Sequence, residues 1–287
     1  MGAIVNGLKQ FDSSEAVARQ LRRDTILMLQ RSKTSHIGSC LSMADALAVL
    51  YRDVLKLNPR DPRWPERDIF MQSKGHAAAI LYACLARYGY LDAAELGRFC
   101  QDGARLGGHV TTHSCPGVEL SVGSLGHALS VAAGVALGAK RKRCTQRVFV
   151  ILSDGECDEG SNWEAALFAA HHCLSNLCVV VDYNRIQSFG AVAEVLRLEP
   201  LAAKWRDFGW DAIEIDGHDH KALHEAFARL GKEAKPLCVV ARTLKGRGAS
   251  QMENALLWHY RSPTKEEAEA ALDELGGRSC EADLWTL

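Results

Sequence analysis

Short apolar runs alternate with stretches of helical periodicity along this chain. The apolar runs have the length and β-branched content of buried strands, and they cover residues 68–73, 148–152, 177–181, 212–216 and 237–242. The periodic stretches predict helices at residues 13–31, 42–55, 77–88, 128–139, 160–172 and 220–230, and a capping box at 264–267 opens a last helix. Strands that alternate with helices predict an α/β fold, in which helices flank a parallel sheet.

The first predicted helix is amphipathic. Val17 and Leu21 lie along one side of it, whereas Arg19, Arg22 and Arg23 are expected to face solvent. The chain has 287 residues and shows no internal repeat, low-complexity tract or linker. We therefore expect residues 1–287 to form one domain.

The charge balance limits the classes of partner. The 34 basic and 35 acidic residues give a formal net charge of -1, which argues against general nucleic-acid or membrane binding. The N-terminus lacks a basic region followed by a long apolar run, so no signal peptide is evident. The longest apolar helix, at residues 128–139, is too short to span a bilayer. We expect a cytoplasmic location.

The 10 cysteines are scattered along the chain without a CxxC pair. This distribution is typical of reduced cysteines, several of them small core residues. Cys157 lies among candidate metal ligands, but we interpret it as a spacer because thiolate suits softer metals.

Oxygen-bearing side chains follow two of the predicted strands. Asp154 comes after the run at 148–152, and Asn184 comes after the run at 177–181. The carboxyl ends of parallel strands meet at one edge of a sheet, where such sheets bind ligands. Carboxylate, amide and backbone oxygens suit Mg²⁺ or Ca²⁺, so Asp154, Asn184 and the Ile186 carbonyl form a candidate metal site that would bridge to a diphosphate. Alone, the pair Asp154-Gly155 would indicate only a turn.

Several histidines lie beside glycines in predicted loops, namely His36, His76, His109, His127 and His259. A single histidine is usually structural or solvated, but such a set suggests close ligand approach and proton transfer near neutral pH. Metal binding is less favoured, because no two of them have a short spacing such as HExxH. We assign no role to His218 and His220.

A long glycine-containing loop, residues 103–126, precedes the helix predicted at 128–139. Its end, Gly123-Ser-Leu-Gly126, can offer backbone N–H groups to a phosphate or to the edge of an aromatic ring. Neither GxGxxG nor GxxxxGK[ST] occurs in the chain, so a nicotinamide-dinucleotide or P-loop site lacks its fingerprint.

In this order, the motifs resemble the N-terminal, cofactor-diphosphate half of transketolases over about residues 14–260. The matching motifs are Ser35-His-Ile-Gly38, Ser73-Lys-Gly-His76, Gly108-His109, Gly123-Ser-Leu-Gly-His127, Asp154-Gly-Glu156, Asp182-Tyr-Asn184, and Lys245-Gly-Arg-Gly248 with Trp258-His259. Two local departures are Ser153 in place of a glycine and Ser124 in place of a proline.

The largest departure is length, because full transketolases continue into a pyrimidine-binding domain and a C-terminal domain. The resemblance therefore implies one subunit of a split transketolase, with a truncated chain as the weaker interpretation. A separate C-terminal subunit would complete an α2β2 heterotetramer. By resemblance, that partner carries the glutamate that hydrogen-bonds the aminopyrimidine of thiamine.

The resemblance implies thiamine diphosphate with Mg²⁺ as cofactors, with Ca²⁺ as a substitute. The reaction would move a two-carbon ketol unit from a ketose to an aldose. The implied metal ligands are Asp154, Asn184 and Ile186, and the implied cofactor contacts also include His76, Gly123, Leu125, Gly155 and Glu156. The implied catalytic residues are His36, His76, His109, His259 and Glu159, the last at the contact with the partner.

Three alternatives stay open. The chain could belong to another thiamine enzyme, such as a deoxyxylulose-phosphate synthase or a 2-oxo acid dehydrogenase. It could also be a non-catalytic subunit that holds the cofactor, or a dinucleotide-binding α/β domain. The combined set of His36, His76, His109 and His259 favours the transketolase-like interpretation.

Overall fold

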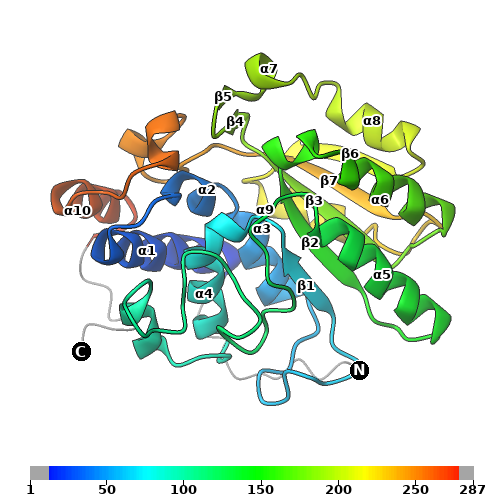
Figure 1. Cartoon of the computed structure of the whole chain (residues 1–287), viewed down its shortest axis with the longest axis horizontal. Coiled ribbons are helices and arrows are strands. Elements are labelled where there is room, and N and C mark those ends of the chain that lie inside the picture. The colour runs from blue at the N-terminus through cyan, green and yellow to red at the C-terminus, as the bar shows by residue number, and fades with distance from the viewer. Residues whose placement is uncertain (1–12, 278–287) are drawn as a thin grey trace.

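A parallel β-sheet lies at the centre of the molecule (Figure 1). The computed structural model describes residues 13–277. Within them, a 5-stranded sheet has the order β1 (Ile69–Gln72), β2 (Val148–Ser153), β3 (Leu177–Tyr183), β7 (Leu237–Arg242) and β6 (Asp211–Asp216). Every neighbouring pair is parallel. The predicted fold class, a parallel sheet flanked by helices, is confirmed.

Helices cover both faces of this sheet. One face carries α1 (Ser14–Ser32), α2 (Ile37–Ser42), α3 (Ala44–Val49), α4 (Ala78–Arg87) and α9 (His220–Phe227). The other carries α5 (Ala128–Arg141), α6 (Gly160–His171) and α8 (Leu201–Asp207), as Figure 1 shows. Successive strand residues point to opposite faces, so Phe149 of β2 packs in the first core and Val150 in the second. Burial on both faces explains why the strands read as continuous apolar runs.

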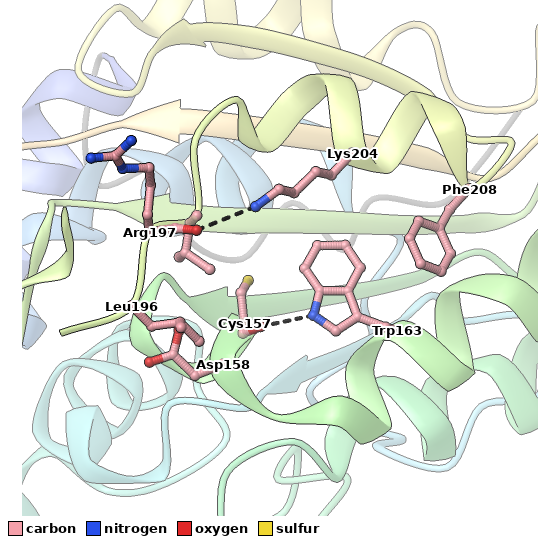
Figure 2. Close-up of a pocket in the computed structure, with 8 residues that line it drawn as sticks. Cys157, Asp158, Trp163, Leu196, Arg197, Lys204 and Phe208 are labelled. Carbon is pink, nitrogen blue, oxygen red and sulfur yellow. Dashed lines mark hydrogen bonds between the residues drawn. The ribbon is translucent and has the colours of Figure 1, made fainter. Parts of the chain in front are cut away.

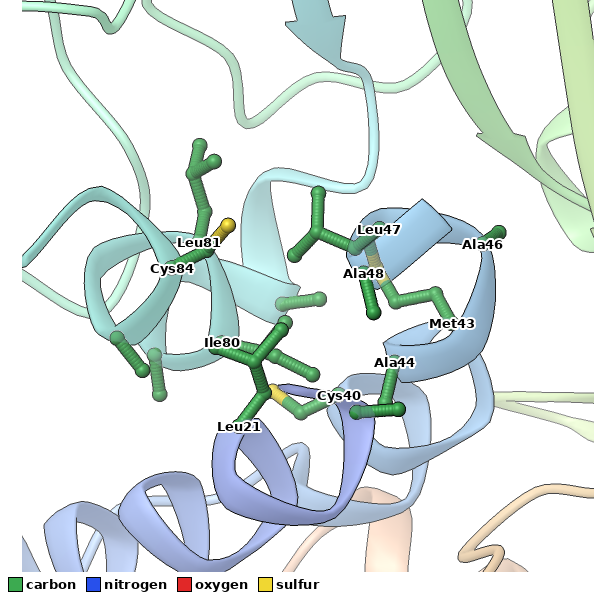
Figure 3. Close-up of a cluster of buried hydrophobic side chains, with 14 of the residues drawn as sticks. Leu21, Cys40, Met43, Ala44, Ala46, Leu47, Ala48, Ile80, Leu81 and Cys84 are labelled. Carbon is green, nitrogen blue, oxygen red and sulfur yellow. The ribbon is translucent and has the colours of Figure 1, made fainter. Parts of the chain in front are cut away.

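The core on the first face joins four helices. Leu21 of α1, Cys40 of α2, Ala44 of α3 and Ile80 of α4 are fully buried and converge (Figure 3). Burial of a side chain such as Leu21 or Ile80 contributes about 1.5–3 kcal/mol. This packing holds α2 against α4, and it therefore sets the relative position of the loops that precede these two helices.

The carboxyl ends of the strands lie at one edge of the sheet. The chain leaves β1 through the short helix η2 (Gly75–Ala77) toward α4 on the first face. It leaves β2 through η4 (Gly155–Asp158) toward α6 on the second face. Connections that diverge in this way mark a switch point of the sheet, and open α/β sheets bind ligands at the strand ends beside such a point.

The C-terminal segment returns to the first face. It forms η5 (Ser250–Met252), η6 (Leu256–His259) and α10 (Lys265–Glu274), and η6 contacts α2 while α10 contacts α1. The predicted capping box is confirmed, because Glu267 N donates to Thr264 Oγ1 at 3.2 Å and Thr264 N donates to Glu267 Oε2 at 2.8 Å. The return of η6 brings His259 beside the start of α2.

Several elements differ from the sequence predictions. Residues 42–55 do not form one helix, because α2 ends at Ser42 and α3 is followed by the π-helical segment η1 (Leu50–Val54). Residues 189–200 carry part of a hairpin, β4 (Ile186–Gln187) with β5 (Gly190–Ala191), and then α7 (Val192–Val195). Helix α8 was not predicted. Such short elements contain too few residues to show a clear period.

The exposure predicted for two arginines is wrong. Arg22 is 7% exposed and donates to both carboxylate oxygens of Asp45, at 3.1 and 2.5 Å. Arg23 is 1% exposed, and its Nη1 donates to the Leu272 carbonyl at 3.1 Å. Helices α3 and α10 cover these sides of α1, whereas Arg19 is exposed as predicted.

Every cysteine between residues 13 and 277 is a free thiol, and Cys280 lies outside the described residues. Cys157 is buried at 1% exposure. No helix in the described part of the chain is both long enough and apolar enough to cross a membrane.

Candidate functional site

Four of the histidines singled out from the sequence meet at the carboxyl edge of the sheet. The ring centroid of His36 lies 5.2 Å from that of His76, 5.0 Å from that of His259 and 6.1 Å from that of His109. The rings of His76 and His259 are 5.7 Å apart. These residues come from four separate segments: the loop before α2, η2, the loop at 103–126, and η6. His127 is exposed and has no ring contact with this histidine cluster among the described contacts.

The backbone at His36 has an unusual conformation. Its φ of 76° lies in the left-handed region, which non-glycine residues adopt at a cost of about 1–3 kcal/mol. The backbone N–H of His36 donates to the carbonyl oxygen of His259 at 3.2 Å, and the side chain Nδ1 lies 3.0 Å from Ser35 Oγ. These contacts hold the strained residue, and they tie two members of the histidine cluster together through the main chain.

Burial keeps the imidazoles of His36, His76 and His259 neutral. Burial, followed by the charges of His109 and Lys245, lowers the pKa of His36 to about 4. Burial and the nearby Lys245 lower the pKa of His259 to about 3. The pKa of His76 is also well below the usual range, because of burial and then Lys74. A neutral imidazole offers one nitrogen that accepts and one N–H that donates, so these rings are suited to hydrogen bonds with the hydroxyl groups of a ligand.

Oxygen atoms gather where β2 and β3 end. Asp154 and Asn184 are buried, at 2% and 3% exposure. Asp154 Oδ1 accepts from Gly155 N at 2.8 Å and Oδ2 from Arg185 N at 2.5 Å, which joins this carboxylate to the segment after β3. Asn184 Oδ1 accepts from Ile186 N at 3.1 Å. The three predicted metal ligands therefore lie close together where β2 and β3 end, and we call this part of the site the oxygen-lined turn.

The electrostatics of this turn suit a bound cation. Burial, followed by the charge of Asp182, raises the pKa of Asp154 to about 6. A cation at this carboxylate would offset both effects, and the oxygen donors present are those that Mg²⁺ prefers. Within residues 13–277, no group of three or more His, Cys, Asp or Glu residues is arranged to hold a metal. A metal here would therefore use the amide and backbone oxygens in addition to Asp154.

A lysine without an assigned role in the sequence analysis lies between the histidine cluster and this turn. Lys245 is 1% exposed, and its Nζ lies 2.8 Å from the carbonyl oxygen of Ile186 and 3.2 Å from Nδ1 of His259. Burial lowers its pKa to about 8. The motif Lys245-Gly-Arg-Gly248 marked this position, but only the fold shows which groups the ammonium contacts.

A second buried lysine had no assigned role either. Lys74 is fully buried and forms an ion pair with Asp182, which is 1% exposed. The Lys74 Nζ also donates to the Ser39 carbonyl oxygen at 2.8 Å. Burial alone would raise the pKa of Asp182, but the ion pair with Lys74 lowers it below the usual value. A sequence signal existed, since a carboxylate directly ends the apolar β3 run.

The glycine loop lies against the turn after β2. Gly126 has a φ of +82°, and its N–H donates to Glu156 Oε1 at 2.8 Å. The fully buried Glu156 also accepts from Ser73 Oγ and from Ser153 N. In this structure Glu156 therefore holds the loop, and the predicted contact between Glu156 and a cofactor stays a prediction.

The other residues predicted to contact the cofactor lie near this loop and differ in how much of each is exposed to solvent. A Cβ built on Gly123 would be 3.8 Å from His109 Cδ2, which places the loop beside the histidine cluster. Leu125 is half-buried. Gly155 is packed so closely that a Cβ there would lie 2.8 Å from Gln187 Cβ. Glu159 is exposed at the start of α6, and its predicted contact with a partner stays a prediction.

A separate pocket lies behind the turn after β2. It has a volume of about 300 Å³, and Figure 2 shows Trp163 and Phe208 toward one side of it, with Cys157 and Asp158 toward the other. Trp163 Nε1 donates to the Cys157 carbonyl at 2.9 Å. None of the clustered histidines lines this pocket, so it is distinct from the site at the strand ends.

The sequence of this chain is similar to those of known proteins. A sequence model described as transketolase, thiamine diphosphate binding domain, matches residues 13–281. An apulose-4-phosphate transketolase subunit of Actinobacillus succinogenes is 40% identical over 266 residues, which are 92% of this chain and 96% of the relative. The 6-deoxy-6-sulfo-D-fructose transketolase subunit SqwG of a Clostridium species is 38% identical over 90% of this chain and 94% of its own length.

Solved structures show the same fold. The transketolase of Leishmania mexicana superposes with a TM-score of 0.89 at 31% identity, and that of Campylobacter jejuni with a TM-score of 0.88 at 30% identity. The alignments cover 96% and 92% of this chain, but 43% of each solved chain. This chain therefore spans less than half the length of these solved enzymes.

Proposed function

This chain belongs to the transketolase family, and on that premise we propose that it is the N-terminal, thiamine diphosphate-binding subunit of a two-component transketolase. The reaction would transfer a two-carbon ketol unit from a ketose to an aldose. We expect the donor to be a ketose phosphate. One observation carries the proposal. The rings of His36, His76, His109 and His259 cluster beside the oxygen-lined turn of Asp154 and Asn184.

The oxygen-lined turn would hold the metal. Asp154, Asn184 and the Ile186 carbonyl would bind Mg²⁺, or Ca²⁺ in its place, and the ion would bridge to the diphosphate. The raised pKa of Asp154 supports this role, because a buried carboxylate next to Asp182 gains from a cation. The ammonium of Lys245, which donates to the Ile186 carbonyl at 2.8 Å in the chain without ligands, would attract the diphosphate rather than the metal ion.

The cofactor contacts would follow the edge of the sheet. Gly155 would lie against the diphosphate, and Gly123 and Leu125 would contact the rings or their linker. When bound, thiamine diphosphate supplies an electron sink for cleaving and forming the carbon–carbon bond next to a ketone. His76 and His109 would orient the two-carbon unit from the side of the histidine cluster.

Two histidines would move substrate protons. Burial lowers the pKa of His36 to about 4 and that of His259 to about 3, so both rings are neutral at neutral pH and present an unprotonated nitrogen to a substrate hydroxyl. Their rings lie 5.0 Å apart, which is close enough for both to reach hydroxyl groups of one sugar. The half-buried positions of both rings leave room for access from solvent.

A partner chain would complete the site. The two bacterial relatives carry names of transketolase subunits, and they match this chain over nearly their whole lengths. Large exposed apolar side chains occur on α6, where Leu167 is 58% and Phe168 is 41% exposed, and on the hairpin, where Phe189 is 83% exposed. Glu159 lies at the start of α6. A C-terminal subunit that carries the pyrimidine-side glutamate would cover these residues in an α2β2 heterotetramer, which we place in the cytoplasm.

Reconstitution tests this proposal. The chain and a candidate C-terminal partner are purified separately, and transfer of a ketol unit from ketose phosphates to aldoses is assayed with Mg²⁺ and thiamine diphosphate. We expect turnover by the mixture and none by either chain alone. Robust ketol transfer by the purified single chain would disprove the two-component arrangement.

The same assay separates the rival functions. Decarboxylation of pyruvate without ketol transfer would instead indicate another thiamine enzyme, of the deoxyxylulose-phosphate synthase or 2-oxo acid dehydrogenase type. Cofactor binding without turnover, in every combination with partners, would indicate a subunit that only holds the cofactor. Calorimetry that detects NAD binding and no magnesium-dependent binding of thiamine diphosphate would indicate a dinucleotide-binding domain.

A further inference from the structure

We propose that Asp182 is the positioning residue that sets the geometry of the whole site, because it ties together the four segments that carry the functional groups. This inference rests on the proposed function for the identity of the cofactor, but its structural content does not. Asp182 occupies the penultimate position of β3, the central strand of the sheet. It is 1% exposed and its side-chain oxygens contact residues of the site, so its role is indirect.

Four side chains donate to this one carboxylate. Oδ2 accepts from Ser42 Oγ at 2.6 Å, from the ammonium of Lys74, and from Asn184 Nδ2 at 3.4 Å. Oδ1 accepts from Thr243 Oγ1. An ionised carboxylate offers about four lone-pair sites, so the hydrogen-bonding capacity of Asp182 is filled. We call these five residues the Asp182 hub.

Each donor in the Asp182 hub belongs to a different segment of the site. Ser42 ends α2, which starts directly after His36. Lys74 precedes η2, which contains His76. Asn184 follows β3, and Thr243 follows β7 two residues before Lys245. Lys74 also donates to the Ser39 carbonyl, so α2 is held at two points.

The Asp182 hub also determines which way the Asn184 amide faces. The carboxylate of Asp182 is ion-paired with Lys74 and accepts from Ser42 and Thr243, so its oxygens act as acceptors. The Nδ2 of Asn184 must therefore face Asp182. As a result, Oδ1 points toward the turn that contains Ile186 N, 3.1 Å away, which is the side of the proposed metal ligands.

A second buried ion pair in the molecule provides a matched control. Asp24 and Arg87 are 0% and 4% exposed, and their carboxylate and guanidinium groups are 2.8 Å apart. They join α1 to α4 within the helical layer rather than at the carboxyl edge of the sheet. If burial of a charge pair mattered only for stability, loss of either pair would have the same effect on cofactor binding.

The test compares Asp182→Asn with Asp24→Asn in the full chain. Urea denaturation measures stability, and calorimetry of the chain assembled with its partner measures magnesium-dependent binding of thiamine diphosphate. We expect both variants to lose stability, but only Asp182→Asn to weaken cofactor binding, by about 10- to 100-fold, as is typical when a residue that orients a metal ligand is replaced. Equal loss of cofactor affinity in both variants would overturn the proposal.

A milder pair of variants decides the question if Asp182→Asn fails to fold. Thr243→Val removes one donor to Asp182 and keeps the shape of the side chain. Thr25→Val is its control, because Thr25 is fully buried in α1 and its Oγ1 has no hydrogen-bond partner within residues 13–277. We expect weaker cofactor binding in Thr243→Val and unchanged binding in Thr25→Val. Unchanged binding in Thr243→Val would then count against the Asp182 hub.

A measurement without cofactor keeps this inference distinct from the proposed function. The imidazole resonances of His36 and His76 are compared by NMR between the unliganded wild-type chain and the Thr243→Val and Thr25→Val variants. We expect shifts in Thr243→Val alone, because α2 and η2 both depend on the Asp182 hub. Failure of the wild-type assembly to bind thiamine diphosphate would sink the proposed function only, whereas unshifted histidine resonances in Thr243→Val would sink the role of Asp182.

Discussion

The ammonium group of Lys245 donates a hydrogen bond to the backbone carbonyl of Ile186 over 2.8 Å, and it also lies 3.2 Å from Nδ1 of His259. An ammonium group is a donor only, so His259 Nδ1 must accept and the ring proton resides on Nε2. Lys245 thus sets the tautomer of His259 while its charge acts on the oxygen-lined turn. The segment after β7 therefore links the histidine cluster to the candidate metal site.

Replacing Lys245 should raise the pKa of His259. Lys245→Met keeps an apolar stem but removes the charge that, after burial, is the next largest cause of the low pKa of His259. We expect that pKa to rise above about 3 and to stay below the ordinary value of 6.5, because the ring stays half-buried. Titration of the ring nitrogens by NMR measures the change. Lys221→Met, at an exposed lysine on α9, is the control, and an unchanged titration in Lys245→Met would contradict the effect of the Lys245 charge on His259.

Removing the charge of Asp154 should weaken cofactor binding and leave the free energy of unfolding nearly unchanged. The folded-state pKa of about 6 lies above the ordinary value of 3.8, so the stabilisation from this group is complete below pH 3.8 and is lost as pH rises through 6. Above that pH, a neutral asparagine avoids the cost of the buried charge. We expect Asp154→Asn to lower magnesium-dependent thiamine diphosphate affinity by about 100-fold or more, with unfolding free energy at pH 7.5 within about 1 kcal/mol of the wild type.

The matched comparison for Asp154→Asn is His36→Ala. His36 is assigned to proton transfer, so this variant should retain the cofactor and lose turnover instead. Calorimetry and steady-state assays of the reconstituted enzyme report the two effects separately. Equal loss of cofactor in both variants would contradict the division of roles between the oxygen-lined turn and the histidine cluster.

The stability of the chain without cofactor should fall in mild acid, and His259 should cause part of the loss. Its folded-state pKa of about 3 lies below the ordinary 6.5, so its contribution is present above pH 6.5 and is lost as pH falls toward 3. We expect the urea midpoint of the wild type to drop more between pH 7 and pH 5 than that of His259→Gln. His113→Gln, at an exposed loop position, should keep the pH dependence of the wild type. Parallel pH profiles for the wild type and His259→Gln would refute this expectation.

Two glycines should respond oppositely to replacement by alanine. Gly126 has a φ of +82°, and an added Cβ would lie 2.6 Å from Ser161 Oγ and 2.7 Å from Glu159 Cβ. We expect Gly126→Ala to lower the free energy of unfolding by about 1–3 kcal/mol and, by displacing Glu159, to weaken assembly with the partner. A Cβ on Gly134 in α5 would meet none of the described residues within 4 Å, so Gly134→Ala should be stabilising by about 0.5–1 kcal/mol. Chemical denaturation measures the free energy of unfolding of both variants. If Gly126→Ala is as stable as the wild type, the loop shifts to accommodate the added Cβ without cost, which would contradict this prediction.

Much of the fold and the membership of the site could be predicted from the sequence. The strands and most of the long helices follow from local periodicity, and the order of the motifs identified His36, His76, Asp154 and Asn184 as members of one site. The helix α8 was missed because Leu201–Asp207 is short and its buried Trp205 packs in a core built by distant segments. Local patterns do not reveal such contacts.

Buried polar groups were the main failure of sequence reasoning. Arg22 was expected to face solvent, and His218 and His220 had no assigned role. In the structure all three contact the carboxylate of Asp45, and His218 Nε2 also accepts from Leu244 N at 2.8 Å, next to Lys245. A charged residue on an amphipathic helix is predicted to be exposed, because the sequence does not show which other helices pack against that side of it.

The sequence by itself determined the class of fold, the family and the identity of the residues at the carboxyl edge, because these depend on local periodicity and on motifs that can be read in order. The tertiary structure decided the geometry: which imidazoles share one cluster, which carbonyl Lys245 contacts, and how Asp182 connects Ser42, Lys74, Asn184 and Thr243. These contacts join positions up to 223 residues apart, as for His36 and His259. Their energies depend on burial, which exists only after the chain has folded.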